Sequence, residues 1–190
     1  MFENLTAIEI CGWLWLGWFF YWVVAAQFVL KRKWDENLKR LQHTVPTLFG
    51  LIGIFHNGHV AALNWGMFHD IAGLKWLGVA LTVAGHGYSV WARRHLGKYW
   101  SGTVALKEGH KLITTGPYAH VRHPIYTGLF LAVIGTVLAA ATWAAIAGFI
   151  VMLAAHYIKW RREENLMIQE FGQEYRDYMN KTKAIVPFIF

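Results

Sequence analysis

The sequence is short of charge and of cysteine, and both shortages limit what the protein can be. Only 15% of its 190 residues are charged, whereas 56% are hydrophobic and 11 are tryptophan. A soluble domain requires more polar surface than this composition supplies, so it indicates a protein of the lipid bilayer. The single cysteine, Cys11, lies in an apolar run and has no second cysteine to bridge to, which excludes a disulfide within the chain.

The excess of positive charge does not indicate nucleic-acid binding. The net charge is +7 at neutral pH, but a nucleic-acid-binding protein gathers its Lys and Arg on one soluble surface. Here the basic residues are distributed between apolar segments. The sequence also lacks internal repeats, low-complexity tracts and flexible linkers. We therefore expect no nucleic-acid partner and a single membrane domain over residues 1–190.

Several apolar runs are long enough to cross a bilayer. A spanning helix needs about 20 residues, with about 17 as the short limit. Runs at 6–30, 45–64 and 71–92 meet this requirement and predict three N-terminal spans within residues 1–92. The apolar stretch 124–160 is twice that length, and 141–142 is its most favourable turn, so we expect a short helical hairpin. The predicted fold is all-α, with five transmembrane helices.

The basic residues predict an orientation. Segments 31–43, 93–122 and 159–183 hold five, six and six Lys and Arg, which is 17 of the 18 in the chain. The remaining one, Lys75, begins the third span, from where its long side chain reaches the interface. Because Lys and Arg concentrate on the cytoplasmic side, we expect the N-terminus outside and the C-terminus in the cytoplasm. The first nine residues carry only acidic charges, so we expect no removable secretory leader.

A charged, amphipathic segment follows the fifth predicted span. We predict one continuous cytoplasmic helix that runs through this segment to about residue 181. Two adjacent carboxylates, Glu163 and Glu164, lie where the span meets the cytoplasm. Two interpretations stay equally open. The carboxylates bind a ligand ammonium group, or they are solvated and pair with Arg161 or Arg162, an exposed arrangement worth about 0–1 kcal/mol.

A polar, aromatic and glycine-containing segment leads into the fourth predicted span. Pro124 suits the first turn of a helix, so Arg122 and His123 lie at the membrane interface. Free N–H groups at that helix start attract a carboxylate, and Tyr126 supplies a hydroxyl. Gly128 allows a ligand or a neighbouring helix to approach the backbone. An amino-acid carboxylate would fit this corner, whereas composition alone favours plain interfacial anchors.

Three motifs follow one another in an order that is more specific than any of them alone. They are Arg122-His123-Pro124-x-Tyr126-x-Gly128, Glu163-Glu164 and Phe171-Gly172-x-x-Tyr175. Together they resemble the isoprenylcysteine carboxyl methyltransferase family, over about residues 93–190. Related phospholipid methyltransferases and membrane sterol reductases contain similar His-Pro and Tyr-Gly elements, so the superfamily is the firmer assignment.

The resemblance implies a membrane methyltransferase core at 93–190 that uses S-adenosyl-L-methionine. Its acceptor would be a lipophilic small molecule or lipid-linked substrate, either an isoprenylcysteine carboxylate or a phospholipid amine. The implied cofactor-binding residues are His110, Lys111, Leu112, Ile113 and Tyr118 at the adenosine end, and His123, Pro124, Ile125 and Tyr126 at the methionine end. Glu163 would bind the ammonium group of the cofactor.

The same resemblance assigns catalytic and substrate-binding candidates. Arg122 and Glu164 are the catalytic candidates, and Glu164 is also expected to pair with Arg122 or to fix the tail helix. Eukaryotic members carry an arginine that meets the substrate carboxylate where this sequence has Lys159, so Lys159 is the substrate-binding candidate and a prenylcysteine substrate is less certain. An amine acceptor would need a base, for which Glu164, His120 and His123 stay open.

The remaining polar residues of the spans have simpler explanations. His56, Asn57 and His59 are candidates for a metal site or a proton path, but hydrogen bonding between helices, with His86 as a partner, is the favoured interpretation. A di-iron oxygenase needs more clustered histidines and inward carboxylates, so we expect no metal. The tryptophan series is expected to face lipid; it consists of Trp13, Trp15, Trp18 and Trp22.

Two other functions compete with a methyltransferase. A membrane NADPH-dependent sterol-type reductase shares the short His-Pro-x-Tyr-x-Gly pattern, and a non-catalytic membrane scaffold needs no site at all. Binding of S-adenosylhomocysteine, of NADPH or of neither compound distinguishes the three.

Overall fold

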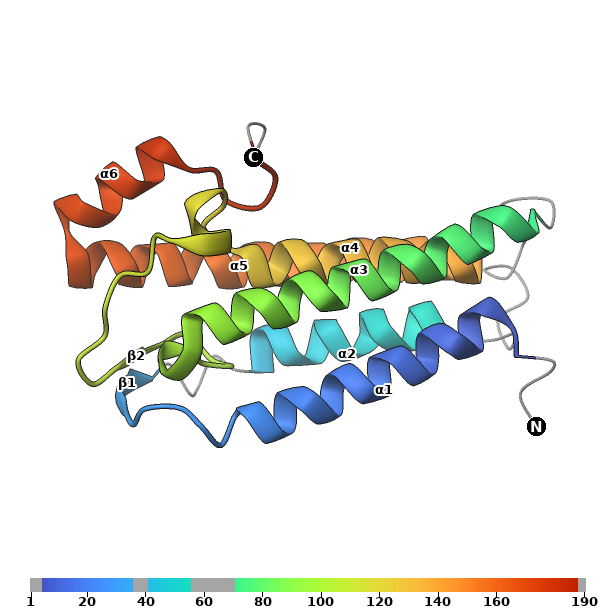
Figure 1. The fold of residues 1–190 in the computed structure, drawn as a ribbon, viewed down its shortest axis with the longest axis horizontal. Coiled ribbons are helices and arrows are strands. Elements are labelled where there is room, and N and C mark those ends of the chain that lie inside the picture. The colour runs from blue at the N-terminus through green and yellow to red at the C-terminus, as the bar shows by residue number, and fades with distance from the viewer. Residues whose placement is uncertain (1–4, 36–40, 56–70, 188–190) are drawn as a thin grey trace.

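The computed structural model describes residues 5–35, 41–55 and 71–187, which form an elongated bundle of helices (Figure 1). The described α-helices are α1 (Ala7–Ala25), α2 (Leu41–Phe55), α3 (Ala72–Leu96), α4 (Pro124–Ala140), α5 (Trp143–Phe171) and α6 (Gln173–Lys181). Two 3₁₀ turns, η3 (Gly97–Tyr99) and η4 (Gly116–Ala119), lie in the chain between α3 and α4. The protein is therefore mostly helical, as the apolar runs predict.

The helix ends follow from local capping chemistry. Thr6 begins α1 by accepting the Glu9 N–H, while the Glu9 carboxylate accepts the Thr6 N–H in return. Between α4 and α5 the backbone turns at Ala141, whose φ is +52°, and the Thr142 hydroxyl caps α5 by accepting the Ala145 N–H. This confirms the helical hairpin and its turn at 141–142.

The prediction of one continuous helix to residue 181 is wrong. Helix α5 runs without a break from the apolar span to Phe171 and stops at Gly172, whose φ is +54°. Glycine adopts this left-handed backbone without the penalty that a Cβ brings. The chain reverses there, and α6 folds back over the end of α5 (Figure 1). The Phe171-Gly172 motif therefore marks a sharp turn between two helices.

A small sheet departs from the all-α prediction. Strands β1 (Arg32–Asp35) and β2 (Ala105–Lys107) pair antiparallel, with Arg32 opposite Lys107. Neither strand is longer than four residues, so no alternating pattern marks them in the sequence. The sheet joins the segment after α1 to the segment after α3 at the end of the bundle where α6 lies (Figure 1).

Close glycine contacts fix two helix pairs. A Cβ added at Gly85 of α3 would lie 2.5 Å from the Gly128 carbonyl oxygen of α4, and one added at Gly128 would lie 2.6 Å from the Gly85 oxygen. A Cβ at Gly50 of α2 would lie 2.7 Å from the Gly148 oxygen of α5. Small residues allow helix backbones in a membrane to approach this closely. Of the two roles predicted for Gly128, the structure shows contact with a neighbouring helix.

Helix α1 packs on α3 and α4 through its tryptophans. The indole N–H of Trp15 donates to the Thr136 hydroxyl at 2.9 Å, and that of Trp18 donates to the Ser89 hydroxyl at 2.8 Å. Trp22 stacks on Trp18 at a ring separation of 4.3 Å. The prediction that the whole series faces lipid is therefore wrong, because an indole N–H in apolar surroundings requires an acceptor. Only Trp13 of this series, 65% exposed, points outward.

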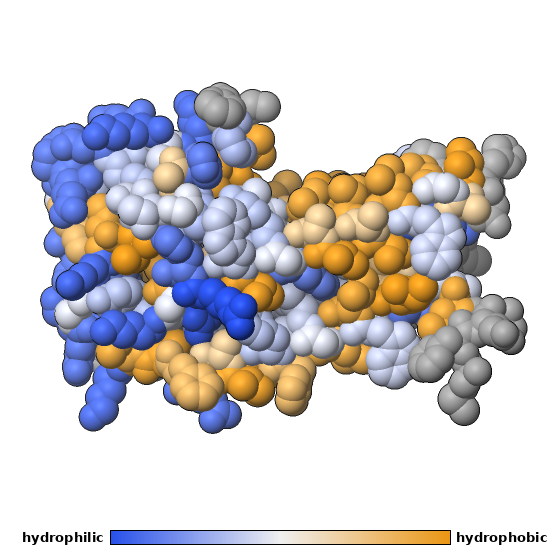
Figure 2. All heavy atoms as spheres, viewed as in Figure 1, coloured by the Kyte–Doolittle hydropathy of each residue, from blue (hydrophilic) through white to orange (hydrophobic). Residues whose placement is uncertain are grey.

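Hydrophobic and hydrophilic residues separate along the bundle. Figure 2 shows hydrophilic residues gathered at the end of the bundle where α6 and the sheet lie, with hydrophobic residues predominating toward the other end. In the described residues, α1 and α5 are long and apolar enough to cross a bilayer, while α4 and residues 45–55 form shorter apolar helices. The predicted five crossings stay a prediction. Residues 56–64 of the second predicted span, with His56, Asn57 and His59, lie outside the described residues.

The glycine contacts generate a matched stability test. We expect Gly85→Ala to lower the thermal unfolding midpoint, because the new methyl would meet the Gly128 carbonyl and the Ala132 backbone. Gly87→Ala, two residues along the same helix, has open space and should be neutral or stabilising by up to about 1 kcal/mol, since alanine favours a helix. Equal midpoints for the two variants in detergent would contradict close packing of α3 on α4.

Candidate active site

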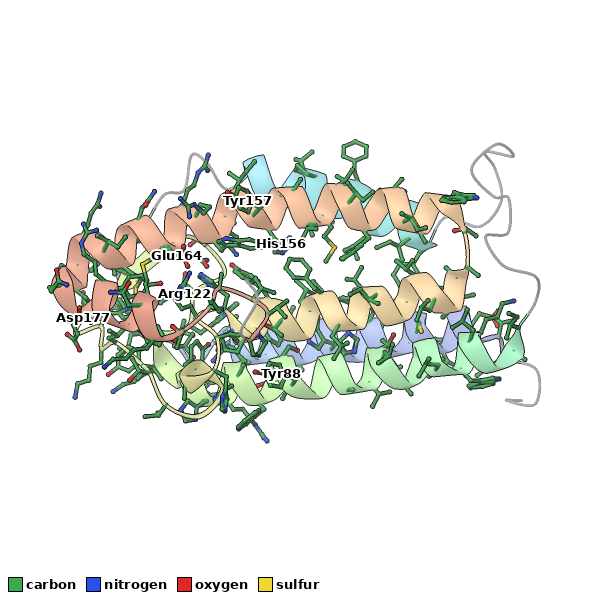
Figure 3. The ribbon with its side chains drawn as sticks, turned by 90° about the horizontal axis from the view of Figure 1, so that it is seen from above. Tyr88, Arg122, His156, Tyr157, Glu164 and Asp177 are labelled. Atoms are coloured by element: carbon green, nitrogen blue, oxygen red, sulfur yellow. The ribbon has the colours of Figure 1, made fainter. Side chains whose placement is uncertain are left out.

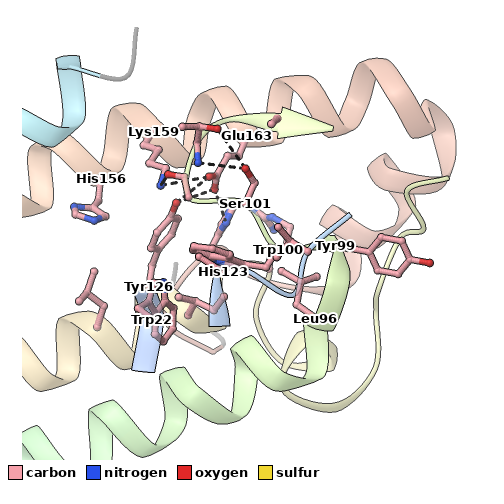
Figure 4. A pocket seen from close by; sticks show the side chains of 18 of the residues that line it. Trp22, Leu96, Tyr99, Trp100, Ser101, His123, Tyr126, His156, Lys159 and Glu163 are labelled. Atoms are coloured by element: carbon pink, nitrogen blue, oxygen red, sulfur yellow. Dashed lines mark hydrogen bonds and ion pairs between the residues drawn. The ribbon is translucent and has the colours of Figure 1, made fainter. Parts of the chain in front are cut away.

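A cavity of about 600 Å³ opens between the polar end of the bundle and its apolar interior. Side chains of the 99–113 segment, the start of α4 and the second half of α5 line its polar end (Figure 4). The other end, which we call the apolar end, is lined by Trp15, Trp18, Phe19, Trp22, Thr47, Leu48, Leu51, Leu129, Met152 and His156. Helices α1 and α2 thus complete a site whose polar residues come from the 99–113 segment, the start of α4 and α5.

Glu163 is the carboxylate on the cavity wall. The Tyr126 hydroxyl donates to its two oxygens at 2.9 and 3.0 Å, which holds the carboxylate in one orientation (Figure 4). The His123 Nδ1 lies 3.7 Å from Glu163 Oε2, and the Lys159 Nζ lies 3.9 Å from Oε1. With 22% of its side chain still exposed, Glu163 can reach a ligand in the cavity.

Glu164 points away from the cavity and forms a buried ion pair. Arg122 Nε donates to Glu164 Oε1 at 2.7 Å, and the Glu164 side chain is only 3% exposed. Figure 3 shows the two side chains directed toward each other. The expected pairing with Arg122 is confirmed, and the alternative that these carboxylates are solvated is wrong. The His123 ring joins the two carboxylates, because its Nε2 lies 3.3 Å from Glu164 Oε1.

The chain at the end of α6 and beyond it, which we call the tail, is hydrogen-bonded to the start of α4. The backbone N–H groups of Arg122 and His123 donate to the carbonyls of Lys183 and Ala184 at 2.8 and 2.9 Å. The Arg122 guanidinium also donates to the carbonyl oxygens of Met179 and Thr182. These contacts satisfy the last carbonyls of α6 and the chain beyond it. Arg122 is therefore a positioning residue in this structure, and its catalytic assignment stays a prediction.

Tyr178 is a second tail contact that the sequence analysis missed. Its hydroxyl donates to the Tyr118 carbonyl oxygen at 2.6 Å and lies in the buried interface of α6. The sequence does carry a signal for it, because Tyr178 lies three residues after Tyr175 and shares its helix face. Burial raises the pKa of Tyr178 to about 12.

The predicted adenosine-end residues all line the cavity: His110, Lys111, Leu112, Ile113 and Tyr118. The His110 Nδ1 accepts the Lys107 N–H at 3.3 Å, and its ring packs 5.9 Å from that of Phe171. Burial lowers the pKa of His110 and raises that of Tyr118, so both side chains are neutral near pH 7. Apart from Lys107 and Lys111, the residues of this segment that line the cavity are therefore uncharged.

The methionine-end predictions separate into two groups. His123, Ile125 and Tyr126 line the cavity, whereas Pro124 is buried in the first turn of α4 and is not among the lining residues. Pro124 therefore starts the helix and has no direct contact with the cavity. His120 also does not line the cavity, and its side chain is exposed.

Lys159 lines the cavity but is already engaged within the protein. Its Nζ donates to the Gly102 carbonyl oxygen at 3.0 Å and lies 5.5 Å from the centre of the Tyr126 ring. Together with Glu163, these contacts balance the positive charge of Lys159. The predicted role in binding a substrate carboxylate is not tested by this arrangement.

His156 is a lining residue that the sequence analysis missed. It lies one helical turn before Lys159, with its ring edge-on to Tyr126 and Phe130 at 5.4 and 5.6 Å. The sequence signal was available, because residues 156, 159 and 163 are spaced i, i+3 and i+7 on one helix face. His86, in contrast, packs against Trp15 and Trp18, and its Nε2 has no hydrogen-bond partner among the described residues.

This chain is similar in sequence to proteins of known function. Residues 77–169 match the model of the isoprenylcysteine carboxyl methyltransferase family. The chain is 34% identical over 112 residues to the protein-S-isoprenylcysteine O-methyltransferase of Saccharomyces cerevisiae, which covers 58% of this chain and 43% of that protein. It is 31% identical over 127 residues to protein-S-isoprenylcysteine O-methyltransferase B of Arabidopsis thaliana, covering 66% and 59%.

This chain is also similar to a solved structure. The structure of the eukaryotic intramembrane Ras methyltransferase, an isoprenylcysteine carboxyl methyltransferase, aligns with a TM-score of 0.59 and 27% identity. The alignment covers 78% of this chain and 53% of that one. The chain thus spans about half the length of the relatives that it matches. The matched region includes the motif at 122–128 and both glutamates, and it ends before α6.

The buried Tyr178 predicts a loss of stability at alkaline pH. Its pKa is raised from 10 to about 12 on folding, so its contribution is complete below pH 10 and is lost as pH rises through about 12. We expect Tyr178→Phe to lower the thermal midpoint at pH 8, because the Tyr118 carbonyl loses its donor at a cost of about 1–3 kcal/mol.

The pH dependence separates this role from simple packing. The midpoint of Tyr178→Phe should fall less steeply than that of the parent between about pH 9.5 and 11. Tyr157→Phe, which alters a half-exposed tyrosine on α5, should leave the slope unchanged. Parallel slopes for the parent and Tyr178→Phe would show that the Tyr178 hydroxyl is not responsible.

Proposed function

We propose that this chain, whose residues 77–169 match the isoprenylcysteine carboxyl methyltransferase family, is a membrane methyltransferase that uses S-adenosyl-L-methionine and acts on a lipophilic acceptor. The observation that supports this proposal best is Glu163, an oriented carboxylate on the wall of a cavity that is polar at one end and apolar at the other. Neither a reductase nor a scaffold has comparable support.

The residues present fit the proposed cofactor. Its sulfonium and ammonium groups require an anion and aromatic walls, and its carboxylate requires a cation or free N–H groups. Glu163, the Tyr126 ring and the N–H groups at the start of α4 supply these groups within one cavity. The volume of about 600 Å³ lies within the range of about 300–1,000 Å³ that is usual for such sites. When bound, the cofactor supplies a methyl group on positively charged sulfur for in-line displacement.

Each lining segment has a proposed role. Glu163 binds the ammonium group, and the start of α4 at Ile125 and Tyr126 offers N–H groups to the carboxylate. The 110–113 segment and Tyr118 pack against the adenosine. Arg122 and Glu164 hold the tail and the carboxylates in register, so that the reacting atoms can be kept in line, which is the main source of rate enhancement in a displacement of this kind.

The acceptor would occupy the apolar end of the cavity. Trp15, Trp18, Leu48 and Leu51 supply a lining suited to a hydrocarbon chain, and this end would exclude water from the reaction. We propose that the acceptor enters from the lipid and places its polar group beside Lys159. Its identity lies between an isoprenylcysteine-carboxylate-like compound and a phospholipid amine.

The proposed topology follows from charge. We propose five crossings with the N-terminus outside and the C-terminus cytoplasmic, which sets the site at the cytoplasmic edge of the bilayer. The distribution of 17 of 18 Lys and Arg over 31–43, 93–122 and 159–183 supports this arrangement.

Calorimetric titration with S-adenosylhomocysteine tests the proposed function. We expect the detergent-solubilised protein to bind it and Glu163→Gln to bind it about 10–100-fold more weakly, because a hydrogen bond to a charged group contributes about 1.5–3 kcal/mol. Glu174→Gln makes the same change at an exposed position on α6 that does not line the cavity, and should bind like the parent.

Two results would count against the proposal. Failure of folded parent protein to bind S-adenosylhomocysteine, or binding of NADPH in its place, would reject methyltransferase function. Equal affinity of Glu163→Gln and the parent would remove Glu163 from the cofactor site while leaving the function standing.

A further inference from the structure

A buried arginine, Arg93, lies close to the cavity without lining it and has no carboxylate partner. It belongs to the last turn of α3 and is only 4% exposed. Among the described residues, no aspartate or glutamate forms an ion pair with it. Burial of a charge without an opposite charge is costly unless other groups compensate it. The groups that compensate Arg93 therefore indicate what this residue does.

Two backbone carbonyls at helix ends accept hydrogen bonds from Arg93. Its Nη1 donates to the Gly97 carbonyl oxygen at 2.8 Å, and its Nη2 donates to the Ala25 carbonyl oxygen at 2.7 Å. Ala25 is the last residue of α1, which has no basic residue in its own last turn. Because the carboxyl end of a helix is negative, a cation from α3 stabilises it there. The Leu30 N–H donates to the Lys98 carbonyl oxygen at 3.0 Å and joins the same two segments.

The face of Trp100 supplies the remaining compensation. The Arg93 Cζ lies 4.5 Å from the centre of the Trp100 ring, which is a cation–π contact. The Arg93 Nε is buried and has no hydrogen-bond partner among the described residues, so hydrogen bonds satisfy only part of the guanidinium. A lysine would not reproduce this arrangement, because it lacks a planar group that stacks on a ring while it donates to two carbonyls. Arg93 therefore fixes the position of Trp100.

Trp100 forms the wall at which the two ends of the cavity meet. Trp100 and Trp22 both line the cavity, and their rings meet edge to face at 5.9 Å (Figure 4). Trp22 belongs to the apolar end, whereas Trp100 belongs to the 99–113 segment at the polar end. The Trp100 ring also lies against Gly102, where an added Cβ would be 3.4 Å from it. The Gly102 carbonyl accepts the hydrogen bond from Lys159, beside which the polar group of the acceptor is proposed to lie.

We infer that Arg93 is a positioning residue for the acceptor. By fixing Trp100 against Trp22 and Gly102, it shapes the wall that the hydrocarbon chain of the acceptor passes to reach Lys159. This inference rests on the proposed methyltransferase function. Arg93 does not line the cavity, so it acts through Trp100. Its loss should therefore weaken acceptor binding, while the donor is still bound at the polar end.

The kinetics of acceptor methylation test this role. The probes are S-farnesyl-N-acetylcysteine and phosphatidylethanolamine vesicles, one for each proposed acceptor class. With the probe that the parent methylates, we expect Arg93→Met to raise the acceptor KM about tenfold, which corresponds to about 1.4 kcal/mol. Because the lost interaction is one of binding, kcat and the affinity for S-adenosylhomocysteine should change much less.

Two further variants complete the kinetic test. Arg93→Lys keeps a cation and should raise the acceptor KM by a smaller factor, so it carries the test if Arg93→Met does not fold. Arg94→Met makes the same change at the exposed neighbouring residue and should match the parent. An unchanged acceptor KM in a folded Arg93 variant overturns the inference.

A double-mutant cycle separates positioning through Trp100 from a general loss of packing. Trp100→Phe alone should also raise the acceptor KM, because a smaller ring leaves the wall incomplete. In the Trp100→Phe background, the further change Arg93→Met should raise the acceptor KM by no more than about twofold, since residues that act through one contact have non-additive effects. Equal rises in the two backgrounds would show that Arg93 does not act through Trp100.

One measurement requires no turnover. Fluorine-19 spectra of protein labelled with 5-fluorotryptophan report on each indole, with the Trp100 and Trp143 signals assigned by their loss in the corresponding Phe variants. We expect Arg93→Lys to shift the Trp100 signal and to leave that of Trp143, an exposed residue at the start of α5, in place. An unmoved Trp100 signal overturns the inference even if the parent methylates neither probe.

The outcomes for the inference and for the proposed function are distinct. Failure of the folded parent protein to bind S-adenosylhomocysteine rejects the proposed function. Binding of S-adenosylhomocysteine together with an unchanged acceptor KM in the Arg93 variants rejects only the positioning role.

Discussion

The ion pair between Arg122 and Glu164 is the interaction on which the site depends. It joins the start of α4 to α5, and through the carbonyls of Met179 and Thr182 it also joins both helices to the tail. Removing one partner of such a buried pair leaves an uncompensated charge and costs about 3–5 kcal/mol. The pair also positions His123, which lies between the two glutamates. The orientation of Glu163 in the cavity is therefore coupled to the folding of the tail.

The cavity exists because the helices do not all pack equally closely. Glycines bring α3 against α4 and α2 against α5, so these pairs have no space between their backbones. Across α4 and α5 the contacts are instead made by large rings, those of Tyr126, Phe130 and His156. Rings that meet edge-on keep the helices apart and leave irregular space beside them. Helix α1 closes one side of that space through its tryptophans, which is why residues far from the family motifs line the site.

The parts of this structure that are local in sequence could be predicted, and those that depend on distant partners could not. The apolar runs and Pro124 predicted the helices and the hairpin turn. The motifs predicted that Tyr126 and Glu163 lie in one site, and the two side chains are hydrogen-bonded. The corner at Gly172 was missed because helix propensity on both sides favours continuation. The direction of Trp15 and Trp18 was missed because their acceptors, Thr136 and Ser89, lie on other helices. The paired strands are likewise too short to show a pattern.

The two ends of the cavity serve different parts of the proposed reaction. The polar end contains residues of the motifs at 122–128 and 163–164, and in the proposed function it is this end that binds the methyl donor. The apolar end is built from α1, α2, the first half of α5 and Leu129 of α4, largely outside those motifs, so under the proposed function the acceptor could differ between relatives without a change in donor binding. Lys159 and His156 lie one helical turn apart at the boundary between the two ends, where Lys159 donates to the Gly102 carbonyl and the His156 ring packs edge-on to Tyr126 and Phe130.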